Sequence, residues 1–126
     1  MDKIFFKEFK ALGEVTRVRI LKVLSVRSMC VCELSQVLDI VQPRVSQHLK
    51  ILKEADLVKE SREGYWIFYS INKERIENVF KVFMEFLDAD LRELQGFERE
   101  YQRYINLDSN EKVKKIKKRL IDTRNE

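Results

Sequence analysis

The chain has 126 residues, which is enough for one domain of ordinary size with a buried core. Its hydrophobic fraction of 44% excludes an intrinsically disordered chain, and its three glycines and one proline favour a mainly helical fold. The formal net charge of +4 favours an anionic partner such as nucleic acid. No apolar run reaches the roughly 18 residues of a membrane span, and no signal-peptide pattern opens the chain, so we expect a cytoplasmic protein without a membrane partner.

The N-terminal residues predict two short amphipathic helices. Residues 4–12 place Phe5 and Phe9 on one face, and Gly13 ends this segment. A second helix is expected from about Thr16 to Ser25, with basic side chains between its apolar positions.

A helix-turn-helix is expected next. A short third helix opens at Cys30, and its predicted buried stripe consists of Leu34, Val37 and Leu38. Residues 39–41 form a tight connection to a fourth helix that runs to about residue 55. Pro43 lies in the first turn of that helix, where its missing N–H costs nothing. Its inward positions recur at i, i+4 and i+7, and these are Val45, Leu49 and Leu52.

The period then changes to that of a β-hairpin. Residues 57–61 and 65–71 are rich in β-branched and aromatic side chains, and residues 62–64 are expected to form the turn between them. Because the second of these strands is so aromatic, at least one face of the hairpin must pack on the helices.

The C-terminal third predicts a long helix and a homodimer. From Asn72 to Tyr104, apolar residues recur at steps of three and four over about eight turns. The residues before Asn72 cannot cover so long a stripe, so we expect it to pair with a second copy. The predicted interface consists of Phe5, Phe9, Phe80, Phe83, Leu87, Leu91 and Leu94. The alternative is a helix that packs within the chain and breaks at Gly96.

These elements imply two parts. Residues 1–106 form one domain, and residues 107–126 form a basic tail that is partly helical, with Asp108 and Glu111 as a capping box. A solvated helix and a helix that contacts phosphate both fit the lysines of this tail.

The order of elements predicts a winged helix-turn-helix, a mainly α fold with a small β-hairpin (α+β) and a long C-terminal dimerisation helix. In that arrangement the helix from Gln42 enters the major groove of double-stranded DNA. A solvated polar face is the alternative, but residues 42–53 carry three basic side chains and no acidic one. The predicted DNA contacts are Gln42, Arg44, Ser46, Gln47, His48 and Lys50 of this helix, with Arg62 of the hairpin.

These segments resemble the ArsR/SmtB-type family of metal-responsive repressors. Residues 11–21 look like its opening helix pair, Met29 to Leu34 like its metal box, Gln42 to Ala55 like its recognition helix, and Gly64 to Ile71 like its wing. The resemblance implies a dimer that binds operator DNA and releases it when a metal or metalloid binds. Three residues depart from the family pattern, namely Val15 in place of proline, Asp56 in place of glycine, and Tyr65 in place of a basic residue.

Cys30 and Cys32 are the candidate metal ligands. On a regular helix, side chains at i and i+2 point about 200° apart, so two thiolates share one ion only at a helix end. Cys30 stands at the N-cap position, and we therefore expect the helix N-terminus to lower the pKa of both thiols. As(III), Sb(III) and Cd(II) suit two thiolates as inducers, and no cofactor is expected for folding.

The resemblance implies a third thiol one turn on, where this chain has Ser35, so two thiolates need solvent, a thiol cosolute or a weaker ligand to complete the site. His48 is expected to pack or to contact phosphate and not to bind metal. The alternatives to soft-ion sensing are thiol oxidation or persulfidation, inert cysteines, and a dimeric interaction module without sensing. No acid–base pair, nucleophile triad or phosphate loop indicates an enzyme.

Overall fold

The computed structural model describes residues 5–124, so residue 4 of the expected first helix lies outside the described residues. The contacts divide the chain into a unit that extends to Leu87 and a unit that begins at Asp88, and each is described by itself. The predicted domain boundary at residue 106 stays a prediction.

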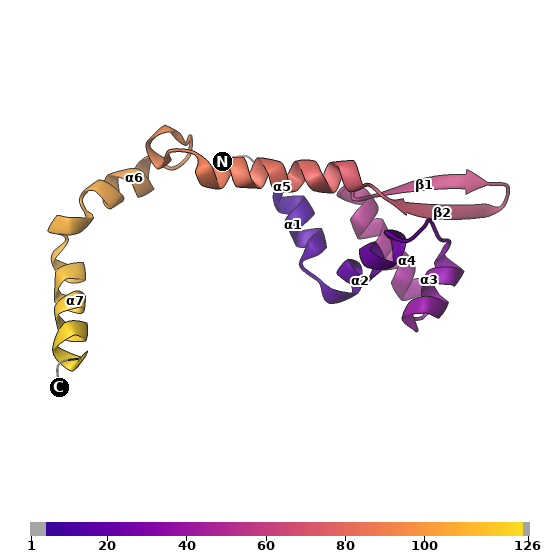
Figure 1. Ribbon diagram of the computed structural model, residues 1–126, viewed down its shortest axis with the longest axis horizontal. Coiled ribbons are helices and arrows are strands. Elements are labelled where there is room, and N and C mark those ends of the chain that lie inside the picture. The colour runs from indigo at the N-terminus through magenta and orange to yellow at the C-terminus, as the bar shows by residue number, and fades with distance from the viewer. Residues whose placement is uncertain (1–4, 125–126) are drawn as a thin grey trace. The chain divides into compact units, whose positions relative to one another are not determined.

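The first unit is a winged helix-turn-helix (Figure 1). Its elements in chain order are α1 (Phe6–Leu12), α2 (Val15–Leu24), α3 (Val31–Leu38), α4 (Gln42–Glu54), β1 (Val58–Glu63), β2 (Trp66–Ile71) and α5 (Lys73–Asp88). The predicted fold class, with its pair of helices followed by a hairpin and a further helix, is confirmed.

An aliphatic core joins α2, α3, α4 and the start of β1. The predicted inward residues of α4, Val45, Leu49 and Leu52, are at most 1% exposed. They pack with side chains of the neighbouring elements, among them Ile20, Leu24, Leu34 and Leu57. The prediction that Val37 is buried is wrong, because only Leu34 is fully enclosed on α3 and Val37 is 58% exposed.

A tight turn sets the angle between α3 and α4. Asp39 ends α3 with a left-handed backbone, φ 54°. The Ser35 hydroxyl donates to the Ile40 carbonyl, and the Ile40 N–H donates to the Ser35 carbonyl at 3.2 Å. Ser35 therefore serves the connection between the two helices.

The hairpin is longer than predicted. β1 and β2 pair antiparallel from Val58 with Ile71 to Glu63 with Trp66, so the turn contains only residues 64 and 65. Gly64 has φ 63° at the first of these positions, where the two-residue turns that match strand twist need a positive φ. The predicted turn at residues 62–64 is therefore wrong, and Arg62 lies inside β1.

A backbone bridge ties the hairpin to the residue that precedes α3. The Met29 N–H donates to the Tyr69 carbonyl at 3.0 Å, and the Tyr69 N–H donates to the Met29 carbonyl at 2.8 Å. This antiparallel pair holds β2 directly beside Cys30.

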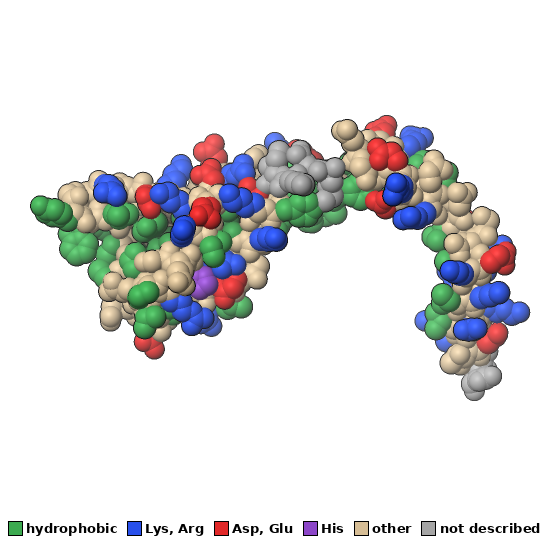
Figure 2. All heavy atoms as spheres, turned by 180° about the vertical axis from the view of Figure 1, so that it is seen from behind, with side chains coloured by type: hydrophobic (Ala, Val, Ile, Leu, Met, Phe, Trp, Pro, Cys, Tyr) green, Lys and Arg blue, Asp and Glu red, His purple; other side chains and the backbone are tan. Residues whose placement is uncertain are grey.

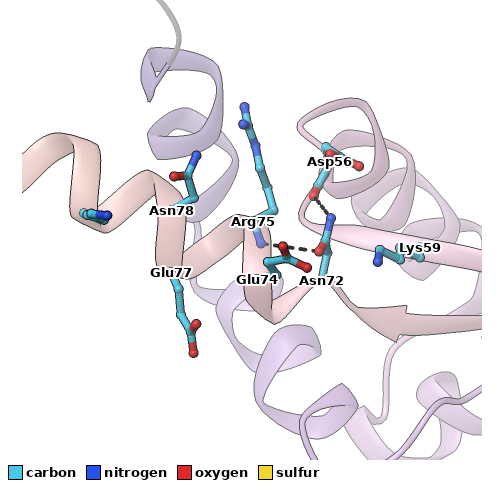
Figure 3. Close-up of a pocket in the computed structure, with 8 residues that line it drawn as sticks. Asp56, Lys59, Asn72, Glu74, Arg75, Glu77 and Asn78 are labelled. Carbon is cyan, nitrogen blue, oxygen red and sulfur yellow. Dashed lines mark hydrogen bonds between the residues drawn. The ribbon is translucent and has the colours of Figure 1, made fainter.

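Asn72 fixes the junction between the hairpin and α5 (Figure 3). It is 7% exposed; its Nδ2 donates to the Asp56 carbonyl at 2.8 Å, and its Oδ1 accepts from the Arg75 backbone N–H at 3.3 Å. The first contact closes the end of α4, and the second caps the start of α5.

Aromatic side chains and one buried ion pair join α1 to α5. The ring centroids of Phe9 and Phe83 lie 4.9 Å apart, and those of Phe5 and Phe83 lie 5.8 Å apart. Glu8 is 4% exposed, and its Oε1 accepts from Arg75 Nη2 at 2.5 Å. Because a buried carboxylate is costly without a partner, this pair fixes where α1 lies on α5.

The second unit corrects the prediction of one helix as far as Tyr104. After α5 ends at Asp88, the chain forms η2 (Leu91–Glu93), α6 (Glu98–Ile105), η3 (Leu107–Ser109) and α7 (Glu111–Arg124). The Asp90 side chain accepts from the Arg92 N–H at 3.0 Å and starts a new turn, and Gly96 has φ 91°. The predicted long helix is therefore interrupted between Asp88 and Glu98, a stretch that contains Gly96, and the alternative that it packs within the chain stays a prediction.

Lysine and arginine side chains gather along α7 (Figure 2). Its start is capped by Asn110, whose Oδ1 accepts from the Val113 N–H at 3.1 Å, and not by Asp108 as predicted. No helix within residues 5–124 is both long enough and apolar enough to cross a membrane.

The left-handed residue after α4 gives a test of the fold. Asp56 has φ 60°, a backbone conformation that costs a residue with a Cβ roughly 1 kcal/mol and glycine nothing. We expect Asp56→Gly to raise the free energy of unfolding by about 0.5 kcal/mol, and the control Lys50→Gly, at an exposed position in the interior of α4, to lower it by about 1 kcal/mol. Urea unfolding of both variants measures this, and equal losses would contradict the role of Asp56.

Candidate DNA interface and thiol site

Helix α4 presents a polar face to solvent, and residues 42–53 of it contain no acidic side chain. Gln42, Arg44, Ser46, Gln47 and Lys50 are all exposed, as predicted from their spacing. The buried residues on the opposite face anchor the helix in the core, so these donors are held on a rigid element.

His48 lies at the inner edge of α4. Its side chain is 13% exposed, and its Nδ1 lies 3.3 Å from Arg17 Nη1 and 3.8 Å from Glu14 Oε2. Arg17 Nε also donates to the Ala11 carbonyl at 2.6 Å, at the end of α1. His48 therefore helps to fasten α4 to α1 and α2, and a contact from it to DNA stays a prediction.

The hairpin is connected to α4 through side chains. Lys53 Nζ lies 2.9 Å from Glu60 Oε2, and the Tyr69 hydroxyl donates to Glu60 Oε1 at 3.1 Å. The hydrogen bond from Lys53 lowers the pKa of the Glu60 carboxyl, which keeps this link charged. Arg62 is exposed on the same strand as Glu60 and further along the hairpin.

The two cysteine sulfurs lie together at the start of α3. Cys30 is the N-cap residue, and its Sγ is 3.1 Å from that of Cys32. The Cys30 N–H donates to Glu33 Oε1 at 3.2 Å, which forms the capping-box contact. The prediction that a helix end brings these i and i+2 side chains to one point is confirmed.

The prediction that the helix N-terminus lowers the pKa of the Cys30 thiol is wrong. Its side chain is only 6% exposed, and this burial, together with the neighbouring Cys32 thiol, raises the pKa of the Cys30 thiol above its usual value. The backbone N–H of the helix start favours the thiolate, but burial outweighs it.

The hairpin forms a wall of the thiol site, which sequence reasoning missed. An open hollow of about 330 Å³ is lined by Arg27, Cys30, Cys32, Glu33, Trp66 and Phe68. Cys32 also borders a second hollow of about 350 Å³ that reaches Gln42 at the start of α4. The i, i+2 spacing of Trp66 and Phe68 places them on one strand face, but no sequence signal says that this face meets α3.

A third metal ligand is not at hand in this part of the chain. Within residues 5–124, no group of three or more His, Cys, Asp or Glu side chains is placed to hold a metal ion. The Ser35 hydroxyl is engaged by the Ile40 carbonyl. Glu33 Oε2 accepts from Arg27 Nη2 at 2.7 Å, which also lowers the pKa of the Glu33 carboxyl.

The predicted dimer residues lie in both units. Phe5, Phe9, Phe80 and Phe83 belong to the aromatic cluster of α1 and α5, where Phe5 is buried within the chain. An exposed stripe runs along α5 through Phe80, Met84 and Leu87, which are 48%, 53% and 56% exposed. Leu91 and Leu94 belong to the second unit.

The hollow drawn in Figure 3 is not a candidate site. Its volume is about 580 Å³, and its lining contains as many acidic as basic side chains. The acidic ones are Asp56, Glu74 and Glu77, and the basic ones are Lys59, Arg75 and Lys81. The charges of the six side chains cancel, and nothing in the lining favours a ligand of either sign.

Known proteins are similar to part of this chain in sequence. Residues 14–60 match the family described as "Bacterial regulatory protein, arsR family". An uncharacterized HTH-type transcriptional regulator of Methanocaldococcus jannaschii is 47% identical over 75 residues, which are 59% of this chain and 84% of that protein. The arsenical resistance operon repressor of Bacillus subtilis is 35% identical over 74 residues, 58% of this chain and 70% of that protein.

Solved structures agree. The homodimeric winged helix-turn-helix DNA-binding domain of a possible ArsR-family regulator of Mycobacterium bovis superposes with a TM-score of 0.57 at 26% identity, covering 68% of this chain and 80% of that domain. With a helix-turn-helix, a wing and these relatives, the chain belongs to the arsR family of bacterial regulatory proteins and is a DNA-binding transcriptional regulator, not an enzyme.

Proposed function

We propose that this regulator is a dimeric repressor that releases operator DNA when a soft metalloid or metal ion binds Cys30 and Cys32. The observation that carries the proposal is the 3.1 Å separation of the two sulfurs at the start of the helix before the recognition helix. The name of the Bacillus subtilis relative, an arsenical resistance operon repressor, supports it.

The proposed DNA contacts follow from the exposed face of α4. Arg44 donates two hydrogen bonds to guanine, and Gln47 pairs with adenine, while Gln42 and Ser46 supply further donors and acceptors. Lys50, His48 and the wing residue Arg62 contact the backbone. Because operator DNA is the partner, we place the protein in the cytoplasm.

The proposed dimer places two recognition helices on successive half-sites. The exposed stripe of Phe80, Met84 and Leu87 on α5 is the kind of apolar face that a second copy covers. Residues 1–106 would then form the DNA-binding and dimerisation domain, and the remaining residues a basic tail.

Two connections carry the proposed signal from the thiols. Met29, which precedes Cys30, is paired with Tyr69 of the wing, and Tyr69 reaches Lys53 of α4 through Glu60. Cys32 borders the hollow that reaches Gln42. When both sulfurs move onto one ion, the start of α3 shifts, and both DNA-contacting elements shift with it.

The sulfur pair suits As(III), Sb(III) and Cd(II), which prefer thiolates to harder ligands. The core beneath it is aliphatic, so we propose that folding requires no bound ion. The second candidate is a thiol-redox or persulfide sensor, which the same 3.1 Å separation favours, because a disulfide needs two sulfurs within reach. The third is a dimeric interaction module without sensing.

The first prediction concerns DNA affinity. We expect Arg44→Ala and Gln47→Ala each to weaken specific operator binding about tenfold or more, since each loses a base-edge contact. Lys50→Ala should weaken binding to specific and non-specific DNA equally. It should also reduce the slope of log affinity against log salt concentration by about one. Fluorescence anisotropy with the promoter of the chain's own gene measures both, and Lys81→Ala on α5 is the control. Unchanged affinities in all three variants would contradict the interface.

The second prediction concerns the inducer. Arsenite should release the DNA from the wild-type chain, and Cys30→Ser and Cys32→Ser should each lose this response while still binding DNA. Ser35→Ala is the control for a third ligand, and its release by arsenite should persist, because the Ser35 hydroxyl is engaged by the Ile40 carbonyl and does not bind the ion. Release by peroxide and not by arsenite would favour the redox sensor, and an intact arsenite response in both cysteine variants would refute the thiol site.

The third prediction concerns assembly. Met84→Glu should convert the dimer to a monomer in light scattering, because it places a charge in the exposed stripe of α5. Lys81→Glu on the same helix should leave the dimer intact. A monomeric wild-type chain at micromolar concentration would contradict the proposed interface.

A further inference from the structure

We propose that the preferred ligand of the thiol pair is a trivalent arsenic or antimony compound that already carries one organic substituent, which lies against Trp66 and Phe68. This inference rests on the proposed function and specifies the ligand of that same site.

The distance between the sulfurs selects a bent pair of bonds. A thiolate lies about 2.3 Å from a soft ion, so an ion that binds two sulfurs in a straight line holds them about 4.6 Å apart. Two such bonds at nearly a right angle hold them about 3.3 Å apart, as at a pyramidal centre with a lone pair. The 3.1 Å separation of the two free thiols is nearer to this bent arrangement than to the straight one, and the bent arrangement is that of As(III) or Sb(III).

Because the protein supplies only two thiol ligands, the site suits a trivalent centre whose third bond is already made. Within the described residues, no group of three His, Cys, Asp or Glu side chains is placed to hold a metal ion. Glu33, the acidic residue beside the thiols, accepts from Arg27 Nη2 and from the Cys30 N–H. The Ser35 hydroxyl is engaged by the Ile40 carbonyl. Arsenite has three exchangeable oxygen ligands, and the two thiolates of this site can replace only two of them. A centre with one carbon substituent needs only two sulfurs.

The wall beside the sulfurs suits a carbon substituent. Trp66 and Phe68 lie on one face of β2 and line the same 330 Å³ hollow as Cys30 and Cys32. Trp66 is 58% exposed, so apolar surface remains to be covered there. The rim charges of Arg27 and Glu33 pair with each other at 2.7 Å, which suits a neutral ligand.

The binding reaction balances without an oxidant. An oxide R–As=O and two protein thiols give R–As(S–Cys30)(S–Cys32) and one water, in which the oxygen leaves with the two thiol protons. Two arsenic–sulfur bonds form, the arsenic–oxygen bond breaks, and arsenic stays trivalent.

Trp66 is the single tryptophan of the chain, so its fluorescence reports on this wall directly. The test compares phenylarsine oxide with arsenite by fluorescence titration of the full chain. Phenylarsine oxide binds any dithiol more tightly than arsenite does. The decisive quantity is therefore the dissociation constant of arsenite divided by that of phenylarsine oxide, and the change in this ratio on mutation. Phe68→Ala should reduce that ratio at least threefold and leave the arsenite constant within twofold. Tyr65→Ala, a fully exposed aromatic at the hairpin tip, should leave the ratio unchanged.

Trp66→Ala tests the wall if Phe68→Ala fails to fold, with the concentration of each compound that releases DNA as the readout. A ratio that is the same in wild type, Phe68→Ala and Trp66→Ala would overturn this inference and leave a dithiol sensor in place. Failure of both compounds to bind would overturn the proposed function as well.

Discussion

The pairing of Met29 with Tyr69 is the contact on which the arrangement of this regulator depends. Two backbone hydrogen bonds of 3.0 and 2.8 Å hold the wing strand against the segment that opens α3. Cys30 follows Met29 directly, so the wing, the thiols and the helix before the recognition helix meet at one place. Besides this pair, the hairpin is joined to the helices through Val58, Tyr69 and Ile71, which pack on the core, and through the Lys53–Glu60 link.

The Met29–Tyr69 junction is bordered by the packed aliphatic core on one side and by open hollows on the other. The aliphatic core holds α4 and the base of β1, where side chains such as Leu52 and Leu57 are completely buried. Trp66 and the hairpin tip stay exposed, and the elements near the thiols are bordered by open hollows. A ligand can therefore approach the sulfurs from the open side, and because Cys30 is buried, moving its sulfur displaces the start of α3 beside the wing.

Local chemistry explains what sequence could predict. The helix-turn-helix followed from the inward spacing of Val45, Leu49 and Leu52, and the closeness of the sulfurs followed from the N-cap position of Cys30. Sequence failed where distant residues meet. The burial that raises the pKa of Cys30 and the aromatic wall at Trp66 both depend on how the hairpin lies on α3. The long helix was overestimated because apolar spacing continues past Asp90, whose capping contact starts a new turn.

In the proposed mechanism, ligand binding at the thiols acts on the wing through the Met29–Tyr69 pair. Amide hydrogen exchange of the DNA-free chain, with and without saturating arsenite, tests it at single residues. The Met29 and Tyr69 amides should be protected in the free chain and should exchange at least several times faster when arsenite is bound. Release of DNA by arsenite with unchanged exchange at both amides would contradict it.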